Sequence, residues 1–125
     1  HGSKYLPEST LERAKVLQWQ FFEQYSHEPY IAVARFIAKY QGMPEARRDE
    51  FAAKQAGGNE ALAVMEQHLE THNYFVGPSI TIADFSLYAY THVADEGGFN
   101  LELYPAIRRW IARLEAHPEH IRMGV

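Results

Sequence analysis

The sequence contains no cysteine, which excludes disulfide bonds, cysteine-based zinc sites and thiol catalysis within its 125 residues. No apolar run approaches the roughly 18–20 residues that a membrane-spanning helix needs. Lysine and arginine do not cluster and the formal net charge is -4, which disfavours a nucleic-acid partner. The start of the chain shows no signal-peptide pattern. Together with the lack of cysteine, this predicts a reducing compartment, and we expect the protein in the cytoplasm.

What is present fits one soluble domain with a single hydrophobic core. Hydrophobic residues make up 46% of the sequence and charged residues 22%, while the aromatic share of 14% is high. The opening His1-Gly2-Ser3 is typical of an expression scar, and we assign residues 4–125 to the domain. Because no initiator methionine precedes the domain, we expect it to be a fragment of a longer protein.

The hydrophobic spacing predicts an all-α bundle of four or five helices, because no stretch alternates as a strand would. The first helix begins near Ser9 or Thr10, and we expect it to continue to about Tyr40 with a bend at Pro29. A further helix begins at Pro44. The Gly57-Gly58 pair either lies inside that helix or divides it, since glycine costs about 1 kcal/mol relative to alanine in a helix.

The first helix has two contrasting faces when its residues are placed at about 100° each. One face is mostly apolar, and we predict that it packs on the core. It consists of Leu11, Ala14, Leu17, Phe21, Phe22 and Tyr25. The opposite face carries Val16, Trp19, Gln20, Glu23, His27 and Tyr30. Because an indole on an outward face needs a cover, we predict that this second face meets another domain or a second subunit.

The segment from Ser79 to Phe85 carries the strongest local signal. Thr81 can cap a helix while Asp84, three residues on, reaches back to the Thr81 backbone N–H, which is a capping box with aspartate in place of glutamate. Ile80 and Phe85 stand where a hydrophobic staple would place them. The following turns are apolar nearly all round, which predicts a buried central helix over about 81–94. For Asp84, this structural role is favoured over that of a catalytic carboxylate.

Two other groups have a chemical and a structural interpretation. His68 and His72 are spaced to share a helix face, as in many metal sites, but no third ligand is apparent. Two surface histidines are therefore favoured, and no metal is predicted. The last helix begins at Pro105 and carries a narrow apolar stripe that includes Trp110, while Arg108, Arg109 and Arg113 face solvent.

The order of these features resembles the C-terminal domain of soluble glutathione S-transferases, and in detail the bacterial members. Five segments carry the resemblance: Leu17-Gln18-Trp19, Leu62 to Leu69, Phe75-Val76-Gly77, Ser79 to Asp84, and Tyr104-Pro105-Ala106 through Trp110. Each segment alone is weak, but five in the right order and spacing are specific. The resemblance covers the chain from Tyr5 to about Arg122.

The resemblance implies a parent transferase that uses glutathione as co-substrate for conjugation or peroxide reduction. The glutathione-binding, thioredoxin-like domain of the family has no counterpart here, so we expect this chain to be inactive alone and to bind no cofactor. It further implies a homodimer and a small electrophilic substrate. Glu23, His27 and Tyr30 become candidates for the electrophile pocket, and Val16, Trp19 and Gln20 for a domain or dimer interface.

An alternative function belongs to another class. The same two-domain fold also serves non-catalytic scaffolds and regulators, in which the helical domain docks a protein partner. The sequence of the absent domain would distinguish the two, because a serine, cysteine or tyrosine at its first strand and a Glu-Ser pair after a cis-proline favour the enzyme.

Overall fold

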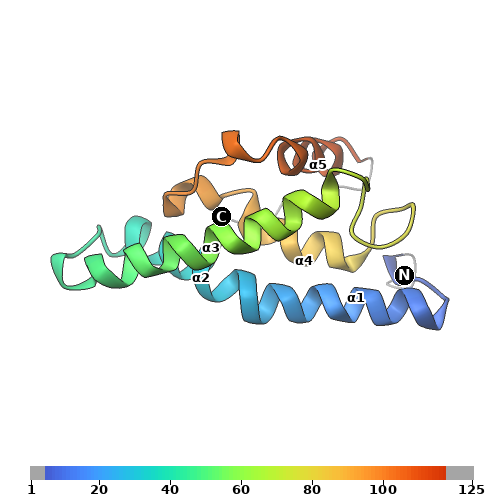
Figure 1. Ribbon diagram of the computed structural model, residues 1–125, viewed down its shortest axis with the longest axis horizontal. Coiled ribbons are helices and arrows are strands. Elements are labelled where there is room, and N and C mark those ends of the chain that lie inside the picture. The colour runs from blue at the N-terminus through green and yellow to red at the C-terminus, as the bar shows by residue number, and fades with distance from the viewer. Residues whose placement is uncertain (1–4, 118–125) are drawn as a thin grey trace.

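The computed structural model describes residues 5–117, and every regular element within them is helical (Figure 1). The main helices are α1 (Thr10–Phe22), α2 (Glu28–Arg35), α3 (Arg48–Leu69), α4 (Ile82–Thr91) and α5 (Pro105–Glu115). The shorter turns are η2 (Glu23–His27), η3 (Phe36–Tyr40), η4 (Glu45–Arg47), η5 (Ala94–Gly97) and η6 (Leu101–Leu103). The predicted all-α bundle is confirmed. None of the helices described is long and apolar enough to cross a membrane.

The first helical run is continuous from Thr10 to Tyr40, as predicted, but it is not a uniform α-helix. The η2 and η3 turns are π-helical, so each holds more residues per turn than the α-helix around it. Pro29 lies in the first turn of α2, directly after η2, and because it has no N–H it removes one hydrogen bond from the helical run. The bend therefore comes from the π turn and the proline together.

Helix α3 passes through the Gly57-Gly58 pair without a break, which settles the alternative left open by the sequence. A Cβ atom at Gly57 would lie 2.3 Å from ring carbons of Tyr30, and one at Gly58 would lie 2.3 Å from the Cζ atom of Phe99. The two glycines let the aromatic rings of other segments approach the α3 backbone. Their cost in helix propensity is therefore offset by close packing.

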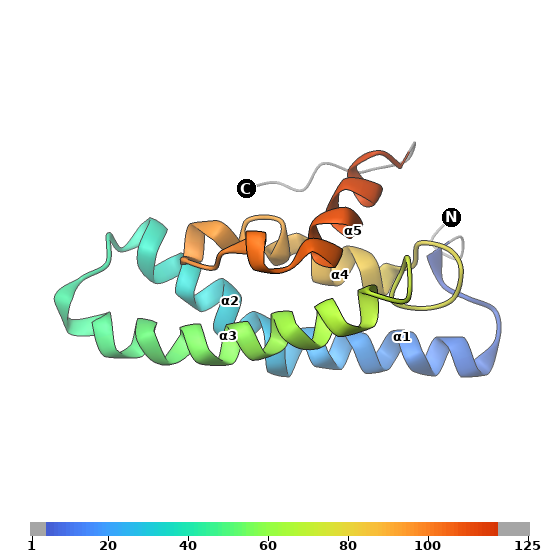
Figure 2. The same ribbon diagram turned by 45° about the horizontal axis from the view of Figure 1, so that its top comes forward.

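Helix α4 lies between α1 and α5 in both views of the bundle (Figure 1, Figure 2). Ala83, Leu87 and Tyr88 are buried, and Phe85 and Ala89 are only partly exposed, in agreement with the predicted central helix. The α-helix ends at Thr91, and the η5 turn follows after a short gap. The core around α4 is formed by large apolar side chains from every main helix, among them Val16, Ile31, Leu62, Met65, Ile107 and Trp110.

The prediction for the two faces of α1 is wrong. Val16 is only 1% exposed and belongs to the core, whereas Leu17, Phe21 and Tyr25 are 53%, 54% and 72% exposed. Leu11 and Ala14 are exposed as well, and of the predicted core stripe only Phe22 packs partly against the core. The hydrophobic pattern predicted the wrong core face for α1, because the face of this helix with more apolar residues lies on the surface. The π turn adds a second error, since it rotates the helix beyond it relative to a uniform wheel.

Candidate functional site

Asp84 is a buried carboxylate that accepts hydrogen bonds from several segments of the bundle. Its Oδ2 atom accepts a hydrogen bond from the Thr81 backbone N–H at 2.9 Å, and the Thr81 hydroxyl accepts one from the N–H of Ala83 at 3.2 Å. The structure therefore contains the predicted capping box. Of the predicted staple pair, Ile80 is buried and Phe85 is half-buried.

The same carboxylate also joins α4 to two distant segments. Its Oδ1 atom accepts from the Phe75 backbone N–H at 3.1 Å and from the indole Nε1–H of Trp110 at 2.9 Å. Burial raises the pKa of Asp84, against the opposing effect of these hydrogen bonds. Because Asp84 is fully buried and both of its carboxylate oxygens accept hydrogen bonds from within the bundle, its role is structural and it is not placed to carry a proton for a substrate.

His27 lies inside the bundle and does not line a pocket. It is 0% exposed, and its Nε2 atom is 2.7 Å from the hydroxyl oxygen of Thr91 on α4. Its Nδ1 atom has no hydrogen-bond partner, and the nearest carboxylate oxygen, on Glu23, is 3.9 Å away. Burial lowers the pKa of His27 to about 4, so the ring is neutral near pH 7. This burial contradicts the prediction of His27 as a pocket residue.

The other two predicted pocket residues do not converge with His27 on one cavity. Glu23 is partly buried, and its pKa is raised by burial and by the charge of Glu28. Tyr30 lines a hollow of about 240 Å³ whose wall includes Tyr25 and Val64. The three side chains therefore do not form one substrate pocket.

The residues predicted to form an interface pack within the bundle instead. The ring of Trp19 lies edge-on to Phe75 at 4.6 Å and to His68 at 5.0 Å between ring centroids. The Gln20 amide donates to the Ser86 hydroxyl at 3.4 Å across to α4. With Val16 in the core, the predicted outward face is the inner face of the helix.

A different surface of this helix is uncovered. Leu11, Leu17, Phe21 and Tyr25 stand on it at helical spacing, and all four are more than half exposed. We call these four residues the α1 stripe. Exposed Val64 on α3 borders it, because Val64 and Tyr25 line the same hollow. An apolar row of this kind is typical of a surface that associates with another protein surface.

A second surface feature lies where α2 passes into η3. A hollow of about 340 Å³ opens there, which we call the α2 pocket. Its lining is Glu28, Ala32, Val33, Arg35, Phe36, Tyr40 and Tyr90. This site was not predicted from the sequence, although one signal for it is visible there: Arg35 stands among the apolar residues of α2. The volume falls at the lower end of the range for small-molecule sites.

His68 and His72, for which no metal site was predicted, stack their rings on each other. Their ring centroids are 4.2 Å apart with an angle of 6° between the planes. The His68 Nε2 atom is 3.3 Å from the carbonyl oxygen of Tyr74, and the His72 Nδ1 atom is 3.0 Å from that of His68. Burial, followed by the charge of His72, lowers the pKa of His68. Within residues 5–117, no group of three or more histidine or acidic side chains is arranged to hold a metal ion.

Comparison with known proteins gives the family. The family model described as "Glutathione S-transferase, C-terminal domain" matches residues 15–118. A solved glutathione S-transferase of Pseudomonas fluorescens is 57% identical, with a TM-score of 0.95 over 98% of this chain and 61% of its own. A solved glutathione S-transferase of Xanthobacter autotrophicus is 44% identical, with a TM-score of 0.93 over 98% of this chain and 60% of its own.

A curated relative carries another name. Elongation factor 1-gamma of Artemia salina is 31% identical over 111 residues, which are 85% of this chain and 25% of that protein. The chain thus spans about three fifths of the two solved relatives and a quarter of this curated one. The match over most of its length shows that the chain belongs to the family of glutathione S-transferase C-terminal domains.

Proposed function

We propose that this chain is the helical domain of a glutathione transferase of the cytoplasm. The parent enzyme would conjugate glutathione to an electrophilic carbon, or reduce a peroxide with it. The observation that carries the proposal is the 57% identity to a glutathione S-transferase over 98% of this chain. In such a protein the thiol is bound and ionised by the other domain, and the helical domain supplies the wall against which the second substrate lies.

We assign the wall for the second substrate to the α2 pocket rather than to Glu23, His27 and Tyr30. Phe36, Tyr40 and Tyr90 offer aromatic surface to the pocket, and all three are exposed in the isolated domain. Aromatic side chains supply large apolar contact area with few rotatable bonds, which suits recognition of a small apolar molecule. His27 is sealed behind Thr91 and cannot reach such a molecule.

We assign the interface of the parent homodimer to the α1 stripe rather than to Val16, Trp19 and Gln20. The stripe presents four large apolar side chains to water, and the rings of Phe21 and Tyr25 lie 6.3 Å apart between centroids with an angle of 32° between their planes. Burial of such surface is favourable by roughly 25 cal/mol per Å² before the costs of association. A second subunit that covers the stripe would therefore gain from contact with it.

The experiment compares the parent protein with this chain under the same conditions. We expect the parent to conjugate glutathione to chlorodinitrobenzene or to reduce cumene hydroperoxide, and the isolated chain to give no turnover above the uncatalysed rate. Both proteins must be purified without glutathione affinity steps, so that host transferases are excluded. Turnover by the isolated chain would contradict the division of labour between the domains.

The same experiment tests the alternative of a non-catalytic scaffold. A parent that folds, contains the glutathione-binding domain and yet turns over neither substrate would support the scaffold. The similarity to elongation factor 1-gamma makes this outcome worth measuring. Stable capture of a protein partner by that inactive parent would then identify the function.

A further inference from the structure

The α2 pocket contains a charged group that the fold leaves incompletely satisfied. Arg35 is 8% exposed, and its Nε–H donates to the Oε1 atom of Glu96 at 2.6 Å. Its Nη2 atom is buried and has no hydrogen-bond partner. A guanidinium has five N–H donors, and buried polar groups in proteins are nearly always paired. An unpaired amino group beside a hollow is therefore a donor that lacks its acceptor.

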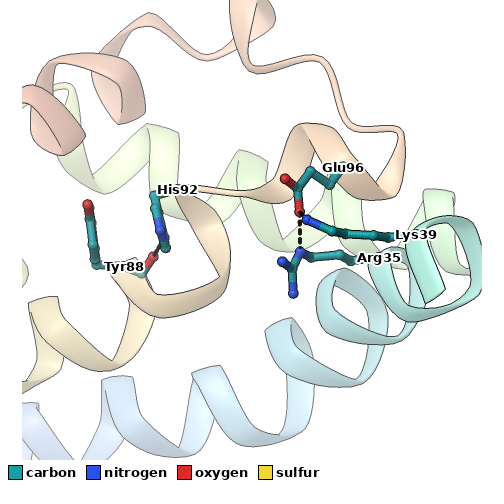
Figure 3. Close-up of polar contacts among 5 residues, drawn as sticks. All are labelled: Arg35, Lys39, Tyr88, His92 and Glu96. Atoms are coloured by element: carbon teal, nitrogen blue, oxygen red, sulfur yellow. Dashed lines mark hydrogen bonds and ion pairs between the residues drawn. The ribbon is translucent and has the colours of Figure 1, made fainter. Parts of the chain in front are cut away.

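Arg35 is held in place by contacts on its other side. The Oε1 atom of Glu96 also accepts from Lys39 Nζ at 3.1 Å, and these two bonds lower the pKa of Glu96. Figure 3 shows the two amino nitrogens of Arg35 pointing away from Glu96 and Lys39. Gly97 fixes the distance between the elements, because a Cβ atom there would lie 2.9 Å from the backbone nitrogen of Arg35. The guanidinium is thus pre-positioned: its Cζ atom lies 5.5 Å from the centroid of the Tyr40 ring, and on its edge away from Glu96 the Nη2 atom is left without a partner.

The charges around this edge favour an anion. Arg35 and Lys39 carry two positive charges and share one carboxylate, so this group of three is net positive. The remaining charge of the pocket is Glu28, seven residues before Arg35. At about 1.5 Å per residue this places the two roughly 10 Å apart along the helix, which is beyond direct contact. The pocket therefore has a basic end at Arg35.

The remainder of the pocket is apolar or aromatic. Phe36 and Tyr40 lie one turn apart with their rings tilted at 36° and 6.0 Å between centroids. Tyr90 on α4 contributes a third ring, and Ala32 and Val33 complete the apolar lining. A molecule that satisfies both parts of the pocket carries an anionic group on an aromatic body.

We propose that the α2 pocket binds small aromatic carboxylates, with Arg35 as the residue that selects the carboxylate. Two parallel N–H···O bonds from a guanidinium to a carboxylate give both strength and orientation. The inference deepens the proposed function, on which it rests for the role of such a molecule as the second substrate. Binding itself requires neither glutathione nor the other domain.

The test is calorimetric or NMR titration of the intact 125-residue chain with naphthoate and with the neutral isostere naphthamide. We expect naphthoate to bind about tenfold more tightly than naphthamide. Arg35→Gln should remove this preference and leave the affinity for naphthamide unchanged. Phe36→Ala should weaken both ligands to a similar degree, because it removes aromatic contact and leaves the guanidinium. The matched control is Leu103→Ala, an exposed apolar residue outside the pocket and outside the α1 stripe, which should change neither affinity.

Equal affinity of the unmodified chain for the two ligands, or no binding of either at millimolar concentration, would overturn the proposal. If Arg35→Gln fails to fold, Phe36→Ala and the comparison of acid with amide still decide, since Phe36 is on the surface. Failure here is distinct from failure of the proposed function, because it leaves open whether the parent conjugates uncharged electrophiles.

Discussion

The half of the molecule around α4 and α5 and the half around α1 and α2 satisfy their polar groups to different degrees. Around Asp84, the backbone N–H groups of Thr81 and Phe75 and the indole of Trp110 all find a carboxylate oxygen. In the other half, His27 and Arg35 each hold a buried nitrogen without a partner. Unmet donors and acceptors are costly in a core, so they mark the half that is arranged for something besides its own stability.

The distribution of exposed apolar residues follows the same division. Leu11, Leu17, Phe21 and Tyr25 stand exposed on the first helical run, and Phe36 and Tyr40 on η3. On α5, by contrast, Ile107, Trp110 and Leu114 are all buried. The α4–α5 half thus covers most of its apolar surface within the chain, with Tyr90 of α4 and Leu103 of η6 as its exposed large apolar side chains, and we call it the completed half. The first helical run instead presents surface suited to a ligand or another protein. Four measurements would break or sharpen this contrast.

The largest loss of stability should follow from a substitution of Asp84, in the completed half. Asp84→Asn keeps the shape of the side chain but replaces one acceptor oxygen by an NH₂ group that faces N–H donors. We expect a loss of about 3 kcal/mol or more in the free energy of unfolding, because at least one buried donor loses its charged partner and the network is disrupted. The measurement is urea denaturation at pH 7.

The exposed surface offers a matched control for Asp84→Asn. Asp49→Asn, in the first turn of α3, changes an exposed carboxylate in the same way and should cost well under 1 kcal/mol. A similar small change for both variants would mean that burial of the Asp84 charge costs as much as its hydrogen bonds contribute. Burial raises the pKa of Asp84, which shows that the cost of burying its charge is comparable with the stabilisation from its hydrogen bonds.

Local chemistry explains which parts of the completed half could be predicted from sequence. The capping box uses residues three apart, and the stripe on α5 is read over two turns, so both are visible in a short window. Glu66 is different: it lies on α3, yet it accepts from the backbone N–H groups of Ala106 and Ile107 at the start of α5. A cap supplied from about 40 residues away leaves no local signal.

The errors in the other half also have physical causes. A helical wheel reports which face is more apolar, and on α1 the more apolar face is the exposed one. The π turn η2 cannot be deduced from hydrophobic spacing, and it changes the direction of every side chain after it. The Arg35–Glu96 pair joins residues 61 apart, so the α2 pocket could be found only from the fold.

Acidification should expose the cost of the buried histidine. The pKa of His27 is lowered from 6.5 to about 4, so the unfolded chain binds a proton that the folded chain refuses between these two values. The contribution is therefore fully present above about pH 6.5 and is lost as the pH falls toward 4, by about 3 kcal/mol. Denaturant titrations at pH 7.5, 6 and 5 should record about 2 kcal/mol of this loss, because pH 5 lies about 1.5 units below the unfolded pKa and each unit is worth about 1.4 kcal/mol.

A non-titrating variant separates His27 from other groups. His27→Gln can still donate to the Thr91 hydroxyl, and it should flatten the pH dependence between 6.5 and 5, even if its stability at pH 7.5 is lower. Asp84 acts in the opposite direction, because a carboxyl with a raised folded pKa favours folding as it becomes protonated. An unchanged slope in the Gln variant would show that His27 is not the group responsible.

A smaller effect is expected at the long-range cap. Glu66→Gln would present an NH₂ group to one of the two N–H donors that begin α5, and we expect a loss of about 1–2 kcal/mol. The control Glu70→Gln removes an exposed carboxylate one turn further along and should be neutral within about 0.5 kcal/mol. If the two variants are equally stable, the α5 cap contributes nothing measurable, and the polar stabilisation of the completed half comes from the Asp84 network.

The smallest effect on folding should accompany a large effect on association at the α1 stripe. Leu17 is more than half exposed, so Leu17→Glu removes little buried contact and should change the free energy of unfolding by less than about 0.5 kcal/mol. Light scattering of the unmodified chain should show concentration-dependent dimers, since the stripe is uncovered, and the Glu variant should remain monomeric because a dimer would bury its charge. Gln67→Glu adds the same charge at an exposed site on α3 and should leave the dimer intact.

A chain that is monomeric at every concentration would show that four exposed apolar side chains are too few to join two copies. The contrast between the halves would then rest on the unpaired nitrogens of His27 and Arg35.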